Sequence, residues 1–147
     1  MKILLPIDGS RHALAAVRYA IHLTTQGLRA RFVLANVQEP VQLYEVLLTP
    51  DLQVLNEASH AAGVDALQPA KSLLKGAELT FESEIAMGQP GNTLLAIVER
   101  FDCKAVIMSS RGAGSLRDAL LGSVSQTLLH DCPVPVMLVK PDSEISG

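Results

Sequence analysis

Residues 2–37, with the sequence KILLPIDGSRHALAAVRYAIHLTTQGLRARFVLANV, decide the fold of this chain. Two continuous apolar runs, at 2–7 and 31–37, enclose a stretch whose apolar side chains recur at helical spacing. Ser10 stands in front of that stretch, where a helix N-cap is expected. Continuous apolar runs are typical of strands that are covered on both faces of a parallel sheet. The stretch therefore predicts a strand, a helix over 11–25 and a second, parallel strand.

The rest of the chain continues this alternation. Further strands are predicted at 78–86, 104–109 and 134–139. Further helices are predicted at 51–75, 90–101 and 123–131. With right-handed crossovers, this order predicts an open, doubly wound, Rossmann-like α/β fold in a single domain over residues 1–147. Its sheet would hold five parallel strands in the order 3-2-1-4-5 and would be flanked by four helices.

Smaller features refine the predicted elements. Polar residues alternate with apolar ones in 78–86, which indicates an edge strand with one wet face. The helix predicted at 51–75 contains Gly63, which is a poor helix former. Its predicted inward positions are Leu52, Leu55, Ala62, Ala66 and Leu73. The connection 38–52 is longer than usual for this kind of fold and is a candidate flap.

Composition and charge narrow the classes of function. The net charge is −3 and aromatic residues make up 3% of the chain, so neither a basic face nor stacking platforms for nucleic acid are expected. No apolar stretch approaches the length of a membrane span, and the apolar run at the N-terminus is too short for a signal peptide. We therefore expect a cytoplasmic protein. Cys103 and Cys132 form no C-x-x-C pair and are expected to act as small hydrophobic side chains.

In doubly wound sheets, ligands bind beyond the carboxyl ends of the strands, where the strand order reverses. The predicted strand ends carry Asp8, Asn36 with Val37, and Ser109 to Gly112. Gly112 and Gly114 could form an anion-binding nest of N–H groups, and Gly122 with Ser123 opens the last predicted helix. Together these features indicate a phosphorylated small molecule, although each of them also occurs in folds that bind no ligand.

Ser123 and Asp8 have simpler structural interpretations as well. Ser123 and Gln126 have the spacing of a capping box, which makes Ser123 the expected N-cap. Asp8 stands in a D-G-S tripeptide, which is a common turn sequence.

No Ser/His/Asp set can be assigned, and no catalytic residue is predicted. The four histidines show no zinc-ligand spacing: His12, His22, His60 and His130.

Three stretches resemble the universal stress protein family: ILLPIDGS (3–10), GQPGNTLLAIVERFDCKAVIMSSRG (88–112) and LLGSVSQTLLHDCPVPVMLVK (120–140). That family has a five-stranded α/β fold related to nucleotide-binding domains, and its members are usually dimeric. One branch binds ATP and carries the motif G-x-x-G-x9-G-[ST], whereas another branch binds no ATP. In this sequence Gly112, Gly122 and Ser123 match the motif, and Ser109 occupies the position of its first glycine.

The resemblance implies a role for each matched residue. Asp8 would meet the adenosine moiety with Pro6 beside it, and Val37 would receive the adenine. Met108 would line the pocket, and Ser109 would stand where family members bring bare backbone near the sugar and phosphates. The residues implied to surround ribose and phosphates are Arg111, Gly112, Gly122, Ser123 and Val124. No acidic pair accompanies the loop, so a bound nucleotide would bring any Mg²⁺ with it.

Dimerisation has support from the sequence as well as from the resemblance. Pro135 cannot donate a ladder hydrogen bond, so the last strand is expected at an edge of the sheet. An apolar edge that is left open invites aggregation, and pairing with a second copy through Val134 to Val139 would protect it. The alternative is an edge covered by the C-terminal tail, which is short and polar.

Three functions remain open on the sequence. The first is a dimeric, ATP-binding regulatory module of the stress response, with at most slow hydrolysis and with unknown protein partners. The second is a dimeric interaction protein that works without a nucleotide. The third is an adenylyl-transferring enzyme; it ranks last, because S-G-G-x-D-S, H-I-G-H and K-M-S-K-S motifs are all missing from the sequence.

Overall fold

The computed structural model describes residues 1–40, 52–110 and 122–141. In chain order its elements are β1 (Lys2–Pro6), α1 (Arg11–Thr25), β2 (Arg31–Gln38), α3 (Leu52–Gly76), β3 (Phe81–Met87), α4 (Pro90–Arg100), β4 (Ala105–Ser109), α5 (Ser123–Asp131) and β5 (Val136–Val139). The strands form one parallel sheet in the order β3-β2-β1-β4-β5. The predicted fold and strand order are confirmed for the described residues.

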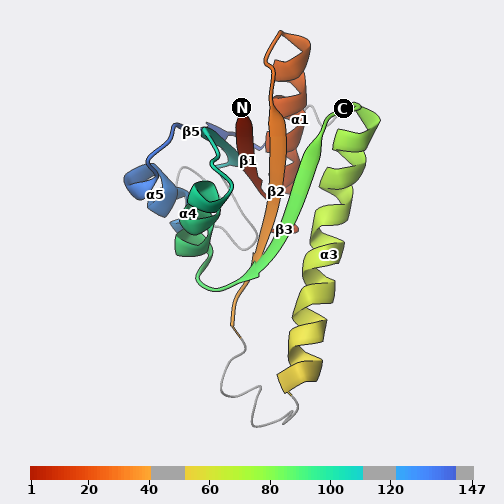
Figure 1. The fold of residues 1–147 in the computed structure, drawn as a ribbon, viewed down its shortest axis with the longest axis vertical. Helices are drawn as coiled ribbons and strands as arrows, with labels where there is room; N and C mark the ends of the chain where they lie inside the picture. The colour runs from red at the N-terminus through yellow and green to blue at the C-terminus, as the bar shows by residue number, and fades with distance from the viewer. Residues whose placement is uncertain (41–51, 111–121, 142–147) are drawn as a thin grey trace.

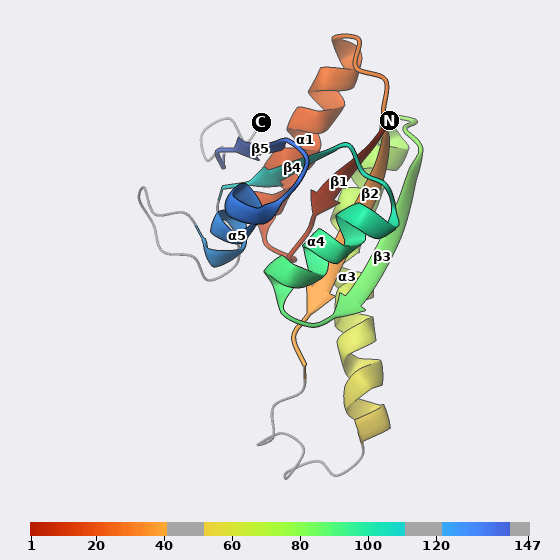
Figure 2. The same ribbon diagram turned by 60° about the vertical axis from the view of Figure 1, so that its left-hand side comes forward.

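Helices cover both faces of the sheet, with α1 and α3 on one face and α4 and α5 on the other (Figures 1 and 2). The apolar strands supply side chains alternately to the two faces, as the pleat of a β-strand requires. In β1, Ile3 and Leu5 belong to the core under α1 and α3, whereas Leu4 belongs to the core under α4 and α5. This alternation decides which side chains can line the candidate site.

The helix α1 confirms the prediction at both of its ends. It runs from Arg11 to Thr25, and Ser10 caps it by accepting a hydrogen bond from the N–H of Ala13 at 3.4 Å. The residues that α1 buries follow helical spacing: Ala13, Ala16, Val17 and Ala20. The small side chains on this face let α1 pack closely against the sheet.

The position of α3 against the sheet differs from the prediction. Its buried positions are Gly63, Leu67, Ala70 and Leu74 rather than the predicted set, in which Ala62 is exposed and Leu55, Ala66 and Leu73 are partly buried. The side chain of Leu52 lies outside the described set. Gly63 is the reason for the difference, because α3 approaches β2 and β3 most closely where it has no side chain. The amino-terminal turns of α3 extend past the carboxyl ends of β2 and β3 (Figures 1 and 2).

The strands β3 and β5 form the two edges of the sheet, as predicted. The face of β3 that was expected to be wet carries ion pairs. Lys2 Nζ lies 2.9 Å from Glu82 Oε2, and Arg100 pairs with Glu84. Both cations also lie over the ring of Phe101, at 5.6 Å and 5.2 Å from its centroid. The acidic side chains of β3 therefore form ion pairs with β1 and α4 while they stay in part exposed to solvent.

None of the helices in the described ranges combines the length and the apolar character that a membrane span requires.

Candidate functional site

The central strands part at the carboxyl edge of the sheet. The pairing of β1 with β4 covers only Ile3 with Ala105 and Leu4 with Val106. On its other side, β1 stays paired with β2 as far as Pro6 with Ala35. The last residues of β1 and β4 therefore diverge on either side of the point where the strand order reverses, which is where sheets of this class bind their ligands.

Three of the predicted site residues meet on one face of the sheet. Met108 is buried in the core under α4 and α5, and Val37 and Val124 pack against that same core. Pro6 follows Leu4 by two residues along β1, so alternation places it on this face as well. The four side chains come from three strands and the first turn of α5, and they give the diverging strands an apolar wall.

Ser109 lies on the opposite face of the sheet. In β4, Met108 faces α4 and α5, whereas Ile107 belongs to the core under α1 and α3. Ser109 follows this alternation and pairs with Val139, which packs against the α1 and α3 core. Its side chain is 5% exposed. The Cβ that replaces the first glycine of the motif is therefore turned away from the apolar wall.

Asp8 sits in the turn that leads from β1 to α1. Its Oδ1 accepts hydrogen bonds from the N–H of Ser10 at 2.9 Å and from the hydroxyl of Ser10 at 2.6 Å. Gly9 has a φ of +90°, a value that L side chains rarely adopt and that this turn requires. The turn role expected for Asp8 is thus present, and the residue is exposed at the edge where the strands diverge.

The helix α5 begins without a side-chain cap. Its N-cap is Gly122, in an extended conformation, and Ser123 is the first helical residue. The predicted capping box, with Ser123 as the N-cap, is therefore wrong by one position. A Cβ on Gly122 would meet no atom of the described residues within 4 Å, so neither packing nor φ demands glycine there. A helix start without a side-chain cap suits an anion, because its first N–H groups have no partner within the helix.

One further contact, between α4 and α5, lies at this edge. A Cβ on Gly91 would lie 2.7 Å from Thr127 Cγ2, so the amino-terminal turn of α4 packs directly against α5. Arg111, Gly112 and Gly114 lie outside the described residues, as does most of the predicted flap, from residue 41 to 51. The anion nest predicted for the two glycines stays a prediction.

Metal binding and thiol chemistry find no support among the described side chains. Within residues 1–40, 52–110 and 122–141, no three side chains of His, Cys, Asp or Glu come together in a way that could hold a metal ion. Cys103 is 2% exposed, and burial raises the pKa of its thiol to about 11. At neutral pH this thiol stays protonated and acts as a small core side chain, as the sequence predicts.

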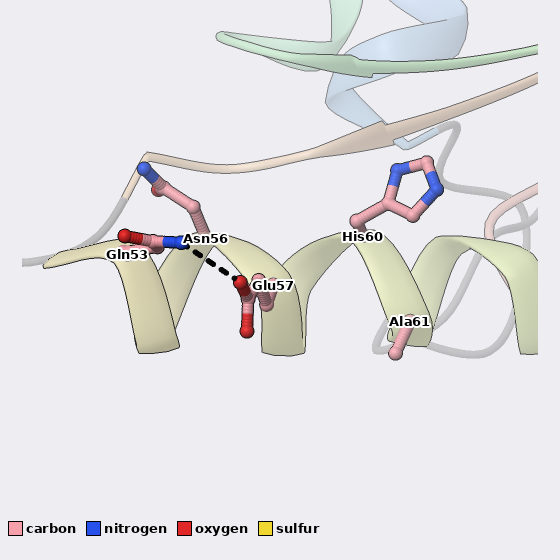
Figure 3. Close-up of a pocket in the computed structure, with 5 residues that line it drawn as sticks. All are labelled: Gln53, Asn56, Glu57, His60 and Ala61. Atoms are coloured by element: carbon pink, nitrogen blue, oxygen red, sulfur yellow. Dashed lines mark hydrogen bonds between the residues drawn. The ribbon is translucent and has the colours of Figure 1, made fainter.

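A hollow of about 460 Å³ lies elsewhere, along the amino-terminal turns of α3. Its lining consists of Gln53, Asn56, Glu57, His60 and Ala61, most of them exposed (Figure 3). Asn56 and His60 project from the same side of the helix, and Gln53 Nε2 donates a hydrogen bond to Glu57 Oε1 at 3.2 Å (Figure 3). All of its lining side chains belong to one helix, and none is among the predicted site residues.

The sequence reasoning placed Asn36 at this edge but assigned it no role, and it missed Gln38. Asn36 is 2% exposed and donates from Nδ2 to the carbonyl of Ile7 at 2.8 Å. Its Oδ1 accepts from Gln38 Nε2 at 2.7 Å. The sequence does carry a signal for this pair, because Asn36 lies inside the apolar run RFVLANV (31–37) and a buried amide has to find hydrogen-bond partners.

Comparisons with known proteins agree with this architecture. The model of the universal stress protein family matches residues 1–140. A universal stress protein of Thermus aquaticus is 31% identical over 142 residues, covering 94% of this chain and 97% of the relative.

Solved structures share the fold. The universal stress protein UspA of Lactobacillus plantarum superimposes with a TM-score of 0.80 at 21% identity, covering 95% of this chain and 97% of that one. A universal stress protein family protein of Arabidopsis thaliana, solved with AMP bound, has a TM-score of 0.70 at 16% identity. The match covers 100% of this chain and 95% of the Arabidopsis chain. The family model and the Thermus relative together show that this chain belongs to the universal stress protein family.

Proposed function

We propose that this protein is a cytoplasmic regulatory module of the stress response, a single domain over residues 1–147 that binds ATP at the carboxyl edge of its sheet. One observation carries the proposal. The strands β1 and β4 diverge beside the apolar wall that Val37, Met108 and Val124 help to form, and the start of α5, which has no side-chain cap, lies at the same edge. The AMP bound by the Arabidopsis relative supports an adenine nucleotide as the class of ligand.

The parts of the nucleotide match the chemistry of this edge. Adenine is flat and apolar on its faces and would pack on Val37 and Met108 beside Pro6. The exposed carboxylate of Asp8 would accept hydrogen bonds from the ribose hydroxyls. The phosphates would lie at Gly122, Ser123 and Val124, with Arg111 and Gly112 closing the site from the other end of their loop.

Only slow hydrolysis is proposed. A general base has to lie within hydrogen-bond reach of the attacking water. Asp8 and Glu39 follow the carboxyl ends of β1 and β2; Asp8 is engaged by Ser10 in the turn, and Glu39 is exposed. Arg111 and the phosphate-facing N–H groups would stabilise bound charge, and any Mg²⁺ would arrive with the nucleotide. Binding rather than turnover would then be the signal that partner proteins read.

Dimerisation is part of the same proposal. The edge strand β5 leaves the side chains of Val136 to Val139 exposed or partly exposed. Met137 is 43% exposed, so the edge strand presents a large apolar side chain to solvent. We propose that two copies pair through Val134 to Val139, because backbone pairing would satisfy the open edge and would bury these side chains.

One observation favours the second candidate, a dimeric interaction protein that works without a nucleotide. Asp8 Oδ1 already accepts two hydrogen bonds from Ser10, so its carboxylate has a structural role in the turn whether or not a ligand is present. The two candidates share the fold and the dimer and differ only in the ligand.

Two experiments distinguish the two candidate functions. The first is mass spectrometry of the small molecules released from the purified native protein, and the second is a measurement of equilibrium binding of ATP. The proposal expects an adenine nucleotide in the released fraction. A Gly122→Val side chain would project into the phosphate position and should weaken binding by about tenfold or more. The matched control is Gly76→Val, because a Cβ on Gly76 would also meet no described atom within 4 Å and this glycine lies at the far end of α3. No binding by the wild type would favour the second candidate, and equal affinities in the two variants would contradict the phosphate position at Gly122.

A further inference from the structure

A buried pair of amide side chains lies behind the candidate site. Asn36 is 2% exposed and faces the layer of α1 and α3, on the side of β2 opposite to Val37. Its Nδ2 donates to the carbonyl of Ile7 at 2.8 Å, and its Oδ1 accepts from Gln38 Nε2 at 2.7 Å. The carbonyl of Ile7 can only accept a hydrogen bond, so it fixes which side of the Asn36 amide faces it, and the bond from Gln38 holds the amide in that orientation.

The amide of Asn36 extends the link between β1 and β2 beyond the end of their ladder. The ladder ends at Pro6 with Ala35, and the N–H of Ile7 still donates to the carbonyl of Ala35 at 2.8 Å. At the Ile7 carbonyl, the side chain of Asn36 supplies the donor. That carbonyl belongs to the same planar peptide group as the N–H of Asp8. The hydrogen bond from Asn36 therefore sets the direction in which the chain enters Asp8.

Two further contacts hold the pair in place. A Cβ on Gly63 would lie 3.1 Å from Asn36 Oδ1 and 2.6 Å from Ile85 Cγ2, so the backbone of α3 closes directly over the amide. The carbonyl of Gln38 accepts a hydrogen bond from the N–H of Gly88 at 3.0 Å, in the turn before α4. One chain of hydrogen bonds thus joins the end of β1, the end of β2 and the start of α4.

We propose that Asn36 and Gln38 are positioning residues for the nucleotide site: they hold the Ile7–Asp8 peptide so that the carboxylate of Asp8 meets the ribose. The proposal rests on the proposed function, because it assumes that Asp8 contacts the ligand. Neither amide touches the ligand, since Asn36 lies on the opposite face of the sheet from the apolar wall. Their effect on binding therefore has to pass through Asp8.

A double-mutant cycle tests this directly. Gln38→Met keeps the length of the side chain and removes the donor to Asn36; Gln38 is half-buried, so the variant should fold. We expect it to weaken ATP binding by roughly fivefold in the wild-type background and by less than about twofold in an Asp8→Ala background. Adenosine should lose as much affinity as ATP, because Asp8 serves the sugar and not the phosphates.

The matched control is Gln68→Met, which makes the same change at an exposed position of α3. It should leave binding unchanged. Equal losses in both backgrounds, or a loss confined to ATP, would show that Gln38 acts on folding or on the phosphates and would overturn the proposal. An unchanged affinity in the wild-type background would overturn it as well.

A second measurement does not depend on the ligand. The N–H of Ser10 donates to Asp8 Oδ1 at 2.9 Å, so its hydrogen exchange reports on how well Asp8 is held. We expect Gln38→Met to speed this exchange by roughly tenfold and to leave the Gln26 N–H at the far end of α1 unchanged. If the wild type binds no adenine nucleotide, the proposed function fails, and exchange at Ser10 still decides whether the amides position Asp8. Unchanged exchange at Ser10 would reject that role.

Discussion

The direction of one side chain decides what the departure from the family motif means. Ser109 stands where the motif has its first glycine, and a Cβ there would obstruct a ligand that lay against it. Alternation along β4 instead directs this Cβ toward the layer of α1 and α3, where Ser109 is 5% exposed. The apolar wall formed with Met108 and Val37 lies on the other face.

Replacement of Ser109 by glycine should therefore do little to binding. We expect the affinity for ATP to change by less than about twofold, since the deleted atoms lie on the face away from the apolar wall. The free energy of unfolding should fall by about 1 kcal/mol, because glycine is unfavourable inside a strand. Calorimetry and denaturant unfolding measure the two effects, and Ser109→Ala separates loss of the hydroxyl from loss of Cβ. A tenfold or larger gain in affinity with glycine alone would contradict this assignment.

A second effect at the scale of a residue depends on pH. His130, in the last turn of α5, is hydrogen-bonded to Asp131 at 2.9 Å, and this bond together with the charge of Asp131 raises the pKa of His130 above its ordinary value of 6.5. The contribution of this pair to folding stability is fully present below the pKa of His130 in the unfolded chain, and it is lost as the pH rises through the higher pKa of His130 in the folded protein. NMR titration should show a raised midpoint for His130 that returns to the ordinary value in Asp131→Asn. An identical midpoint in both proteins would contradict the pairing.

At this scale the sequence predicted positions better than directions. Strand ends alone placed Asp8 and Val37 at this edge, because parallel strands end together, whereas the resemblance to the family supplied Pro6, Met108 and Val124. The face on which Ser109 lies, and the N-cap of α5, depended on one-residue details that a spacing pattern does not resolve. Arg111 and Gly112 remain predictions.

At the scale of elements, the packing of α3 on the sheet depends on Gly63. A Cβ there would lie 2.6 Å from Ile85 Cγ2 and 3.1 Å from Asn36 Oδ1. Ile85 is β-branched and stiff, so it cannot turn aside easily. The glycine that reads in the sequence as a weak point of the helix is the point of its closest contact.

Gly63→Ala should consequently destabilise the protein, although alanine favours a helix. We expect the free energy of unfolding to fall by about 1–2 kcal/mol, since the clash outweighs the gain of about 1 kcal/mol from the better helix former. Gly76→Ala is the matched control, because nothing among the described atoms lies within 4 Å of a Cβ at that position of the same helix. Its stability should stay the same or rise. Equal effects of the two substitutions in urea unfolding would contradict the close packing at Gly63.

The helices and strands themselves were largely predictable. The bounds of α1 and α5 agree with the sequence pattern. The bounds of the other elements differ from the pattern by no more than two residues, except that β3 begins three residues later than predicted. The buried face of α3 was not. Alanines occupy several faces of this helix and give the pattern little contrast, and the deciding contact is made by a residue without a side chain. Hydrophobic periodicity carries no information about such a contact.

At the scale of the molecule, the two edges of the sheet differ in how they are protected. On β3, Glu82 and Glu84 form ion pairs with Lys2 and Arg100, and such charges discourage edge-to-edge pairing. On β5 the side chains of Val136 to Val139 are apolar and at least partly exposed. This contrast favours β5 as the edge at which the proposed dimer would form.

A charge placed on β5 should then break the dimer. Met137→Lys puts a cation on a side chain that is 43% exposed in the single chain, and sedimentation velocity should show a shift from dimer to monomer. The control is Met87→Lys on the opposite edge, where the methionine is 45% exposed, and it should leave the dimer intact. A dimer that survives Met137→Lys but dissociates in Met87→Lys would place the interface on β3.

The topology of the whole molecule was the most predictable feature. Alternating strands and helices with right-handed crossovers leave few possible arrangements, and the strand order and both edge strands agree with the prediction. The ligand was less predictable, because the fold determines where a molecule binds more firmly than which molecule it is.

Titration of the isotopically labelled protein with ATP, followed by amide NMR, tests the central claim most directly. We predict saturable shifts with a dissociation constant below about 1 mM, at Asp8, Val37, Met108 and the start of α5 from Gly122 to Val124. The amide resonances of Gln26 and Gly76, at the carboxyl-terminal ends of α1 and α3, should not shift. Saturating shifts confined to other parts of the molecule, or no shifts at millimolar ATP, would contradict a nucleotide site at the carboxyl edge of the sheet.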